Sequence, residues 1–558
     1  MFENNNMILV VIPARGGSKG IPRKNLRLLR HKPLISYSIE IAKASKYVDD
    51  VVVTTDDSQI SLIAEKFGAS VVRRSEELSS DDVLLDPVIH DAMIQKEKLA
   101  FDEYDIVITL QPTSPLINVE TLDRGIEKFE DFGIDSVISV VDDRHLSWGY
   151  DENHERYFPT YIERVGKDDL PKSFRETGGI LATRRSFVRE NSCLGTNIDI
   201  VEVSPEESVN IEKFEDWWIA ENYLMRKNIA MVVDADEEIG TAHIDRCISL
   251  ASKLVFHKAL FLVKESHQLA IDTLNKLNYS FKTYEDYSEL FDILNKSNSQ
   301  IVVNDILDTS EEYMLTLKQQ GYFVVNFEDL GLGVKYADVV FDDLYEHDMS
   351  EENVYTGYKY YVLKDEFFYQ HPKIITKKVN RILINSKEIN QHDFTEKVID
   401  SILSTNYDGR IDVIVGVGYD NLENIISKYE SNPLVQIYQN VLNVSEFMFT
   451  ADIIFTSNNK SVYEICSIGV PTIVISKDDR EALHTFTNIN NGFVNLGLAE
   501  HVDSQTLIDE FAKLVNDYEL RMNLHKKMLS FNLKNGFENI NSIVEEEYRK
   551  FEFNNNLR

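Results

Sequence analysis

Hydrophobic and polar positions follow two alternating periods from the start of the chain. Short apolar runs rich in Val and Ile lie at 7–14, 49–57 and 105–111. Between them, 33–45 and 58–70 carry apolar residues at helical spacing. Strands that alternate with amphipathic helices are typical of a mostly parallel sheet with crossover helices. The pattern therefore predicts an α/β fold.

The same order of strand, loop and helix starts again twice. A helical segment at 214–227 is followed by a new strand and helix at 229–254, and another strand begins at 379–386. At 558 residues the chain is too long for one hydrophobic core. We predict three domains, with a first boundary near Lys227: 1–228, 229–376 and 377–558.

The last two predicted domains are two successive Rossmann-like halves. Open parallel sheets bind ligands at the carboxyl ends of their strands, so two such halves predict a ligand cleft between them. We expect a two-lobed shape like that of GT-B glycosyltransferases.

Composition and charge narrow the partners. The sequence is 43% hydrophobic and has 93 acidic against 58 basic residues, a net charge of -35. This charge opposes general attraction to nucleic acid or to an anionic membrane, so we expect neither as a partner. Any bound anion must be held by a local group of cations.

The cysteines and the first residues indicate a compartment. Cys193, Cys247 and Cys466 are far apart and form no Cys-x-x-Cys pair, which argues against a disulfide framework or a zinc site. The apolar run at the start is short and strand-like, unlike a signal peptide, and no segment approaches the ~20 apolar residues of a membrane helix. We expect a cytoplasmic protein.

The strongest candidate for chemistry is the loop that follows the first strand. Residues 12–25 read IPARGGSKGIPRKN, and they open the basic cluster between Arg15 and Arg30. Gly16, Gly17 and Gly20 let backbone N–H groups approach phosphate oxygens, and Arg15 and Lys19 supply charge. The loop has neither the Walker nor the dinucleotide pattern of glycines. Its chemistry suits a triphosphate.

The full string resembles the opening motif of the acylneuraminate (CMP-sialic acid) cytidylyltransferase family. The resemblance covers about residues 7–228 and continues through four further segments: 51–57 with Asp56, 71–82 with Arg73, 110–116 with Gln111, and 170–185 with Arg175. It implies a nucleotidyltransferase with a Rossmann-like mixed sheet. The implied reaction transfers CMP from CTP to a nonulosonic, sialic-acid-like nine-carbon sugar acid and releases pyrophosphate.

The resemblance also implies roles for single residues. Arg15 and Lys19 would be catalytic, and the sugar acid would meet Gln111 and Arg175, whose guanidinium can bond both carboxylate oxygens. The remaining implied nucleotide-binding residues are Gly16, Gly17, Ser18, Asn25, which would face the cytosine, and Arg73. A homodimer through this domain is implied as well.

Mg²⁺ is the implied cofactor, because it would neutralise the triphosphate during the transfer. Members of the family commonly carry an Asp-x-Asp pair near the end of the domain, where this chain has Asn210 and Glu212. On an extended strand these two side chains would share one face and offer oxygen ligands. The equally favoured alternative is an ordinary solvated strand face.

The chain from about 229 to 550 resembles the UDP-sugar hydrolase of pseudaminic acid biosynthesis, a relative of GT-B glycosyltransferases. The loop with Gly240 and His243 would provide a base that activates water, and Glu464 would help to bind a UDP-sugar. Departures weaken this reading, because the family's usual second loop glycine is Ala242, and its glycine loops are replaced at 384–388 and 456–461. A capping or packing role for His243 is equally favoured.

Three alternatives therefore remain open. The first domain could serve another acidic sugar, such as an eight-carbon ulosonate. The C-terminal half could be a non-catalytic module that binds a nucleotide sugar. It could also be a glycosyltransferase, although fold alone would not establish that.

Overall fold

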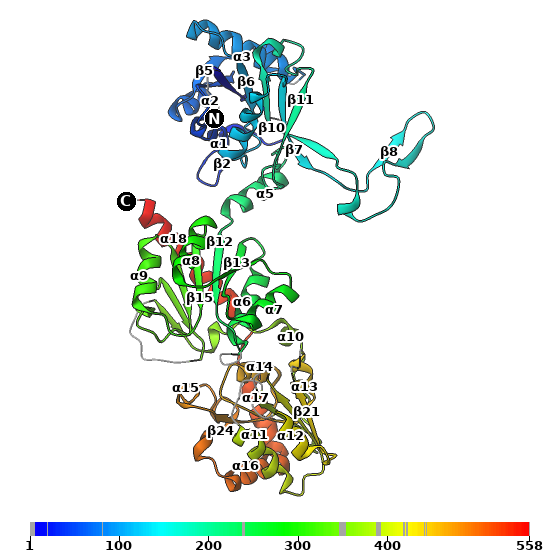
Figure 1. Cartoon of the computed structure of the whole chain (residues 1–558), viewed down its shortest axis with the longest axis vertical. Helices are drawn as coiled ribbons and strands as arrows, with labels where there is room; N and C mark the ends of the chain where they lie inside the picture. Colours follow the sequence, from blue (N-terminus) through cyan, green and yellow to red (C-terminus); the bar gives the residue numbers. More distant parts are fainter. Residues whose placement is uncertain are drawn as a thin grey trace. The chain divides into compact units, whose positions relative to one another are not determined.

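The computed structural model describes residues 6–18, 20–80, 82–236, 240–344, 353–386, 392–416, 419, 422–439, 441 and 443–556 (Figure 1). The chain forms two compact units, Met1–Arg226 and Lys227–Arg558. Each is described by itself below. The boundary expected near Lys227 lies beside this division.

The first unit is built on a mixed sheet, as predicted. Across the described part of this unit the sheet has seven strands, in the order β11 (Ile198–Glu202), β7 (Ser136–Asp142), β10 (Phe174–Arg184), β6 (Ile106–Leu110), β1 (Ile8–Pro13), β4 (Asp50–Thr55), β5 (Ser70–Arg73). Strand β10 runs antiparallel to β6 and β7, and the other pairs are parallel. The covering helices are α1 (Leu34–Ala44), α2 (Ser58–Lys66), α3 (Leu85–Ala100), α4 (Val119–Glu127) and α5 (Phe214–Met225).

Strand β1 lies at the centre of this sheet, between β4 and β6. Its residues 8–12 are fully buried, because helices cover both faces of the sheet and alternate side chains enter two separate hydrophobic clusters. Parallel strands end at the same edge, so the loops after β1, β4 and β6 meet there. This edge carries the candidate site.

A long ribbon leaves the sheet between β7 and β10. It contains the antiparallel hairpin β8 (Trp148–Asp151) and β9 (Arg156–Pro159), which extends away from the body of the first unit in Figure 1. The ribbon carries exposed apolar side chains at Trp148, Tyr157 and Ile162. The strand and helix pattern of the sequence did not predict this hairpin.

The second unit contains two sheets whose strand pairs are all parallel, which confirms the two predicted Rossmann-like halves. In its described residues the first sheet runs β14 (Phe281–Tyr284), β13 (Lys258–Lys264), β12 (Asn228–Val233), β15 (Ile301–Asp305), β16 (Phe323–Phe327), β17 (Val339–Asp342), β18 (Val354–Thr356). The second runs β21 (Val435–Gln439), β20 (Arg410–Val415), β19 (Arg381–Ser386), β22 (Ile453–Thr456), β23 (Thr472–Ser476), β24 (Phe493–Leu498). We call the parts built on these sheets the first lobe and the second lobe.

Helices flank both sheets of this unit. Those of the first lobe are α6 (Ala242–Lys253), α7 (Gln268–Lys276), α8 (Tyr287–Lys296) and α9 (Glu311–Gln319), and α10 (Asp365–Phe368) lies on the connection between the lobes. Those of the second lobe are α11 (His392–Leu403), α12 (Leu422–Tyr429), α13 (Val444–Thr450), α14 (Ser461–Ile468), α15 (Asp479–Ala482), α16 (Ser504–Asn516) and α17 (Tyr518–Met528).

The last helix, α18 (Gly536–Asn556), corrects one predicted boundary. The sequence analysis assigned all of 377–558 to the second lobe, but Ile540 and Tyr548 of this helix are buried in the core of the first lobe. The rings of Tyr548 and Phe323 lie 5.3 Å apart. The chain thus returns to the first lobe, because the apolar face of α18 covers the sheet around β16 and β17.

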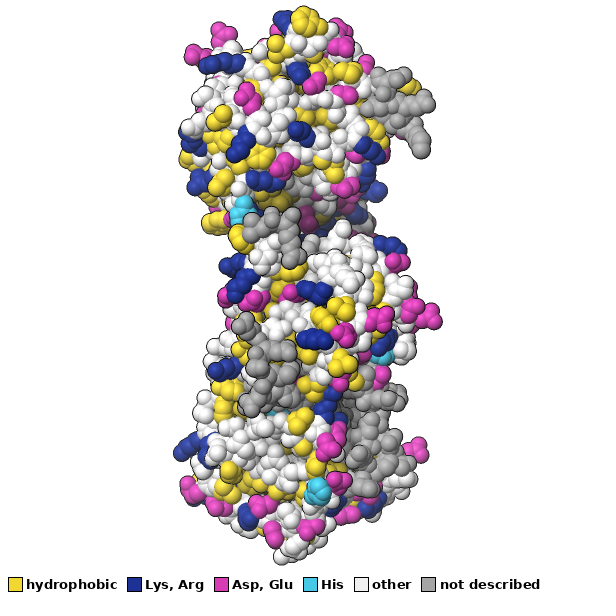
Figure 2. All heavy atoms as spheres, turned by 90° about the vertical axis from the view of Figure 1, so that its left-hand side faces the viewer, with side chains coloured by type: hydrophobic (Ala, Val, Ile, Leu, Met, Phe, Trp, Pro, Cys, Tyr) yellow, Lys and Arg dark blue, Asp and Glu magenta, His cyan; other side chains and the backbone are white. Residues whose placement is uncertain are grey.

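Two further features concern the surface. In the described part of the chain no helix is both long and apolar enough to cross a membrane. On the face shown in Figure 2, basic and acidic side chains are interspersed.

Candidate functional site

The loop after β1 is fixed to the loop after β4. The backbone N–H of Gly16 donates a hydrogen bond of 2.9 Å to Oδ1 of Asp56. A Cβ atom at Gly16 would come within 2.9 Å of Oδ2 of Asp57, so a larger residue would force the two loops apart. Glycine is therefore needed here for the approach of Asp57.

The other glycines of this loop have different surroundings. A Cβ atom at Gly20 would lie 2.3 Å from the backbone oxygen of Glu212, which brings the segment before α5 against the loop. Around Gly17 nothing lies within 4 Å of such an atom. The loop thus has one tightly packed side and one open side on which a ligand can lie.

Side chains of the short helical turn Lys24–Leu26 contact the loop and the segment before α5. Asn25 is almost fully buried, and its Nδ2 donates a hydrogen bond of 3.1 Å to the backbone oxygen of Arg15. Lys24 Nζ donates to the backbone oxygen of Ile211 at 2.8 Å. Burial lowers the pKa of Lys24, and the charge of Arg15 lowers it too, while Glu212 opposes the shift. The cations of Lys24 and Arg15 therefore lie close enough to each other to interact.

Arg73, which is implied to bind the nucleotide, and its neighbour Arg74 differ in burial. This residue ends β5 with its side chain exposed, whereas Arg74 is 6% exposed and its Nη2 donates to the backbone oxygen of Thr54 at 2.9 Å. Burial lowers the pKa of Arg74 to about 10, opposed by Asp56 and reinforced by Arg15. Alternate residues of a strand share a face, so Arg74 follows Val72 inward. Arg74 is therefore the arginine whose charge interacts with Arg15 and Asp56, and the role implied for Arg73 stays a prediction.

Gln111 and Asn210 meet around Gly178. A Cβ atom at Gly178 would lie 3.3 Å from Nε2 of Gln111 and 3.7 Å from Nδ2 of Asn210. Gly178 has a φ of +71°, and the register of β10 against β7 shifts between Glu176 and Leu181. This irregularity makes room for both amides at the end of β6.

The predicted metal ligands are not on a strand. Asn210 and Glu212 lie in the irregular segment before α5, which corrects the expectation of an extended face. The Oδ1 atom of Asn210 is buried and has no hydrogen-bond partner among the described residues. The described residues contain no group of three or more His, Cys, Asp or Glu side chains arranged to hold a metal ion.

The remaining predicted residues of the first unit are less closely grouped. Arg175 on β10 pairs with Val141 on β7, beyond the bulge, and its Nε lies 3.7 Å from Oδ1 of Asp143. Its side chain is 54% exposed. Ser18 is half-buried on the glycine loop, and Lys19 lies outside the described residues.

In the second unit His243 is part of a buried charged cluster. Its Nδ1 lies 2.6 Å from Oδ1 of Asp305, and Arg246 donates to both oxygens of the same carboxylate at 2.6 and 2.7 Å. Burial alone would raise the pKa of Asp305, but Arg246 and His243 hold that pKa well below its usual value. A buried histidine beside a carboxylate suits either a base or a structural role.

Gly240 and Glu464 lie on different elements of this unit. Gly240 has a φ of +81°, which favours glycine, and it precedes α6. Glu464 is on α14 and pairs at 3.1 Å with Lys364, which pairs at the same distance with Asp245. Glu464 lines a pocket between the two lobes, and His243 is not among the described residues that line it.

Comparisons with known proteins identify relatives of the first unit. Residues 9–185 match the model of a family described as Cytidylyltransferase. N-acylneuraminate cytidylyltransferase A of Danio rerio is 32% identical over 224 residues, 39% of this chain and 51% of that protein. Pseudaminic acid cytidylyltransferase of Campylobacter jejuni is 32% identical over 188 residues, 33% of this chain and 81% of that protein.

The chain belongs to the cytidylyltransferase family. It spans about half the length of the two Danio rerio relatives that it matches. The crystal structure of MurG from Acinetobacter baumannii covers 57% of this chain and is itself covered to 99%, at 12% identity and a TM-score of 0.43.

Sequence reasoning missed two residues of this cytidylyltransferase site. Arg74 could have been found from the strand period, since it shares the face of the buried Val72. Lys24 is one of several basic residues of the motif, and only the hydrogen bond to Ile211 shows that it joins the motif to the segment before α5. That contact joins positions far apart in sequence and leaves no local signal.

Proposed function

We propose that the cytidylyltransferase unit transfers CMP from CTP to a sialic-acid-like sugar acid and releases pyrophosphate. The observation that carries this proposal is the glycine loop after β1, tied to Asp56 and bordered by Arg15, Lys24 and Arg74. Two relatives support it, since one is named for N-acylneuraminate and the other for pseudaminic acid.

In this proposal the anomeric hydroxyl of the sugar attacks the α-phosphorus of CTP, and the bond to the β-phosphate breaks. Phosphoryl-type transfer depends mainly on positioning and on stabilising charge. Arg15 with Ser18 and Lys19 would bind the triphosphate, and backbone N–H groups of Gly16 and Gly17 would approach its oxygens. Asn25 would face the cytosine. Lys24 and Arg74 would add charge at the same edge.

Mg²⁺ remains part of the proposal, with Asn210 and Glu212 as the protein ligands. An unpartnered, buried Oδ1 on Asn210 and a carboxylate two residues later offer two oxygen ligands. This fits Mg²⁺, which keeps several waters and takes one or two protein ligands together with substrate phosphates. Bound Mg²⁺ would neutralise charge on the triphosphate.

The sugar acid would be recognised by Gln111 and Arg175. The close approach of Gln111 to Gly178 supports a substrate pocket at the end of β6. Arg175 lies on β10, next to the ribbon between β7 and β10, and its side chain is 54% exposed and accessible to a ligand. An eight-carbon ulosonate is the alternative acceptor, because the glycine loop concerns the nucleotide and not the sugar.

We also propose that the protein acts as a homodimer. The ribbon of the first unit exposes Trp148 to 60%, Tyr157 to 74% and Ile162 completely, and apolar groups of this size favour burial against a partner. Sedimentation of a Trp148→Glu, Ile162→Glu variant should show a monomer, whereas the exposed Phe101→Glu should leave a dimer. A monomeric parent protein would refute the proposal.

The proposed location of the protein is a reducing compartment such as the cytoplasm. Cys193, Cys247 and Cys466 are all free and buried. Buried thiols of this kind are common where disulfides do not form.

The decisive experiment measures pyrophosphate release with CTP, Mg²⁺ and a panel of N-acetylneuraminic, legionaminic, pseudaminic and eight-carbon sugar acids. Release with one nine-carbon acid that is lost in Arg15→Ala would support the activity and the site together. Release only with the eight-carbon acid would favour the alternative acceptor. If a folded protein that binds CTP releases none with any acid, the proposal is wrong.

A further inference from the structure

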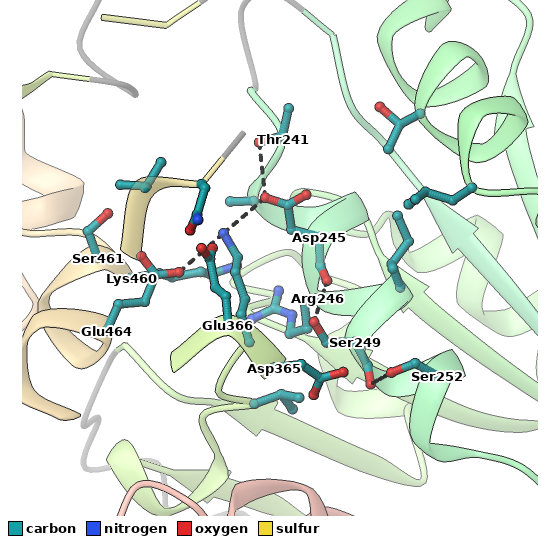
Figure 3. A pocket seen from close by; sticks show the side chains of 18 of the residues that line it. Thr241, Asp245, Arg246, Ser249, Ser252, Asp365, Glu366, Lys460, Ser461 and Glu464 are labelled. Atoms are coloured by element: carbon teal, nitrogen blue, oxygen red, sulfur yellow. Dashed lines mark hydrogen bonds and ion pairs between the residues drawn. The ribbon is translucent and has the colours of Figure 1, made fainter. Parts of the chain in front are cut away.

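The pocket between the lobes of the second unit has a volume of about 900 Å³, at the upper end of the range for small-molecule sites. Helices α6 and α7 of the first lobe line one side, and α14 with Asn385 of β19 lines the other (Figure 3). At the carboxyl edge of an open parallel sheet, phosphate commonly binds to the N-terminus of a helix that follows a strand. Here that helix is α14, after β22.

The start of α14 is occupied by side chains of its own chain. Oδ1 of Asn459 accepts a hydrogen bond of 2.9 Å from the N–H of Ser461, and Nδ2 of the same residue donates to Oγ of Ser457 at 2.8 Å. Asn458 donates to the backbone oxygens of Glu481 and His484 at 2.9 and 3.0 Å. An anion would have to displace these contacts.

Three of the described cations that line the pocket, Arg246, Lys364 and Lys460, have carboxylates beside them, whereas Lys276 has no such neighbour and Lys460 Nζ makes no hydrogen bond among the described residues. Lys460 lies 3.2 Å from Glu328, and Arg246 pairs with Glu328 and Asp305. Lys364 stands 3.1 Å from each of two carboxylates, Asp245 in the first lobe and Glu464 in the second. A phosphate would therefore compete with carboxylates that are already in place, and additional carboxylates of Asp365 and Glu366 face the same space.

The rest of the wall offers hydrogen-bond acceptors. The hydroxyls of Ser249, Ser252 and Thr273 donate to backbone oxygens of their own helices at 2.7 to 2.9 Å, so their lone pairs remain for a ligand. Asn385 is 4% exposed, and its Oδ1 has no hydrogen-bond partner among the described residues. Acceptors of this kind need donors, which sugar hydroxyls supply and a phosphate dianion does not.

We propose that this pocket binds an uncharged sugar without a nucleoside diphosphate. Hydroxyl and carboxylate oxygens would accept from the sugar hydroxyls, and the rings of Tyr279 and Tyr361 would offer apolar surface to the pyranose. The binding makes the second unit a sugar-binding module in which the side chain of Asn459 occupies the start of α14.

Calorimetric titration of the full-length protein tests this directly. The probes are N-acetylglucosamine, N-acetylgalactosamine, N-acetylmannosamine, UDP and UDP-N-acetylglucosamine. At least one free sugar should bind with one site per chain, and the UDP-sugar should bind no more tightly than the free sugar. Thr273→Trp, which places a ring in the pocket, should weaken sugar binding at least tenfold. Asn275→Trp is the matched control, because it is exposed on the same helix outside the pocket and should leave binding unchanged.

Two results would overturn the proposal. One is binding of UDP, or tighter binding of the UDP-sugar, that Thr273→Trp abolishes. If the Thr273→Trp variant still binds UDP, that binding is outside this pocket. The proposal is then judged by whether the free sugars bind and whether the UDP-sugar binds more tightly than they do. The other is the absence of binding by every free sugar in the panel.

Discussion

At the scale of single residues, neighbours in sequence can have opposite roles. Arg73 and Arg74 are both basic, yet the strand period turns the first to solvent and the second to the buried face. A sequence motif locates the segment, but it does not show which of the two neighbouring arginines points inward. The burial of Val72 shows that Arg74, two residues later, points to the same inner face.

This difference predicts unequal effects in two matched variants. Arg74→Met removes a buried cation beside Arg15 and Asp56, so kcat/KM for CTP should fall at least about 100-fold, the usual cost of losing one group that stabilises developing charge. Arg73→Met should change kcat/KM by less than about threefold, since exposed substitutions away from a site have small effects. Pyrophosphate release measures both. If kcat/KM fell by a similar factor in both variants, Arg73 would have to contribute to the site as well.

A second residue-scale prediction concerns pH and the buried acid Asp343. Burial raises the pKa of this carboxyl well above 3.8, and the neighbouring Glu328 raises it further. A raised pKa means that the folded form holds a proton that the unfolded chain releases. Its contribution to stability is therefore full below pH 3.8 and is lost as pH rises toward the folded pKa.

Asp343→Asn removes this titration. The free energy of unfolding of the variant minus that of the parent should increase as pH rises from about 4 to neutrality, by about 1.4 kcal/mol for each pKa unit of the shift, and the Tm difference should rise with it. Thermal unfolding followed at several pH values measures the difference. A difference that stays constant with pH would show that Asp343 ionises in the folded protein.

At the scale of elements, hydrophobic periodicity predicted most strands and helices but not every partner. The runs at 7–14 and 105–111 became β1 and β6, because buried strands of a parallel sheet are apolar on both faces. An amphipathic helix reports which of its faces is buried, but it does not report which sheet covers that face. For this reason α18 was assigned to the wrong lobe, and the irregular segment with Asn210 was taken for a strand.

The placement of α18 can be tested with two aromatic positions on that helix. Tyr548 is 8% exposed and packs on Phe323, so Tyr548→Ala should lower the free energy of unfolding of the second unit by about 3 kcal/mol. Phe553→Ala, at a position 65% exposed, should have little effect. Chemical denaturation measures both. Equal stabilities would mean that the helix does not stabilise the first lobe.

At the scale of the whole molecule, the chain joins two units with separate cores. Clusters around β1 belong to residues before 226, and those around β12 and β19 belong to residues after it. The two candidate sites are divided in the same way. The glycine loop after β1 lies in the first unit, and the pocket between the lobes lies in the second. The sequence showed this division because the strand and helix order restarts, but only side-chain contacts show that Asn459 occupies the start of α14.

Separate cores predict separate ligand responses in the intact chain. A ligand stabilises only the unit that binds it, by about 2.7 kcal/mol at 100 times its Kd. In calorimetry CTP with Mg²⁺ should raise the Tm of one transition, and a free N-acetylhexosamine that binds should raise the Tm of the other. Arg15→Ala should remove the first shift alone, and Thr273→Trp the second alone. If CTP raised both transitions equally, the units would unfold together, and the division of the molecule into independent binding units would be wrong.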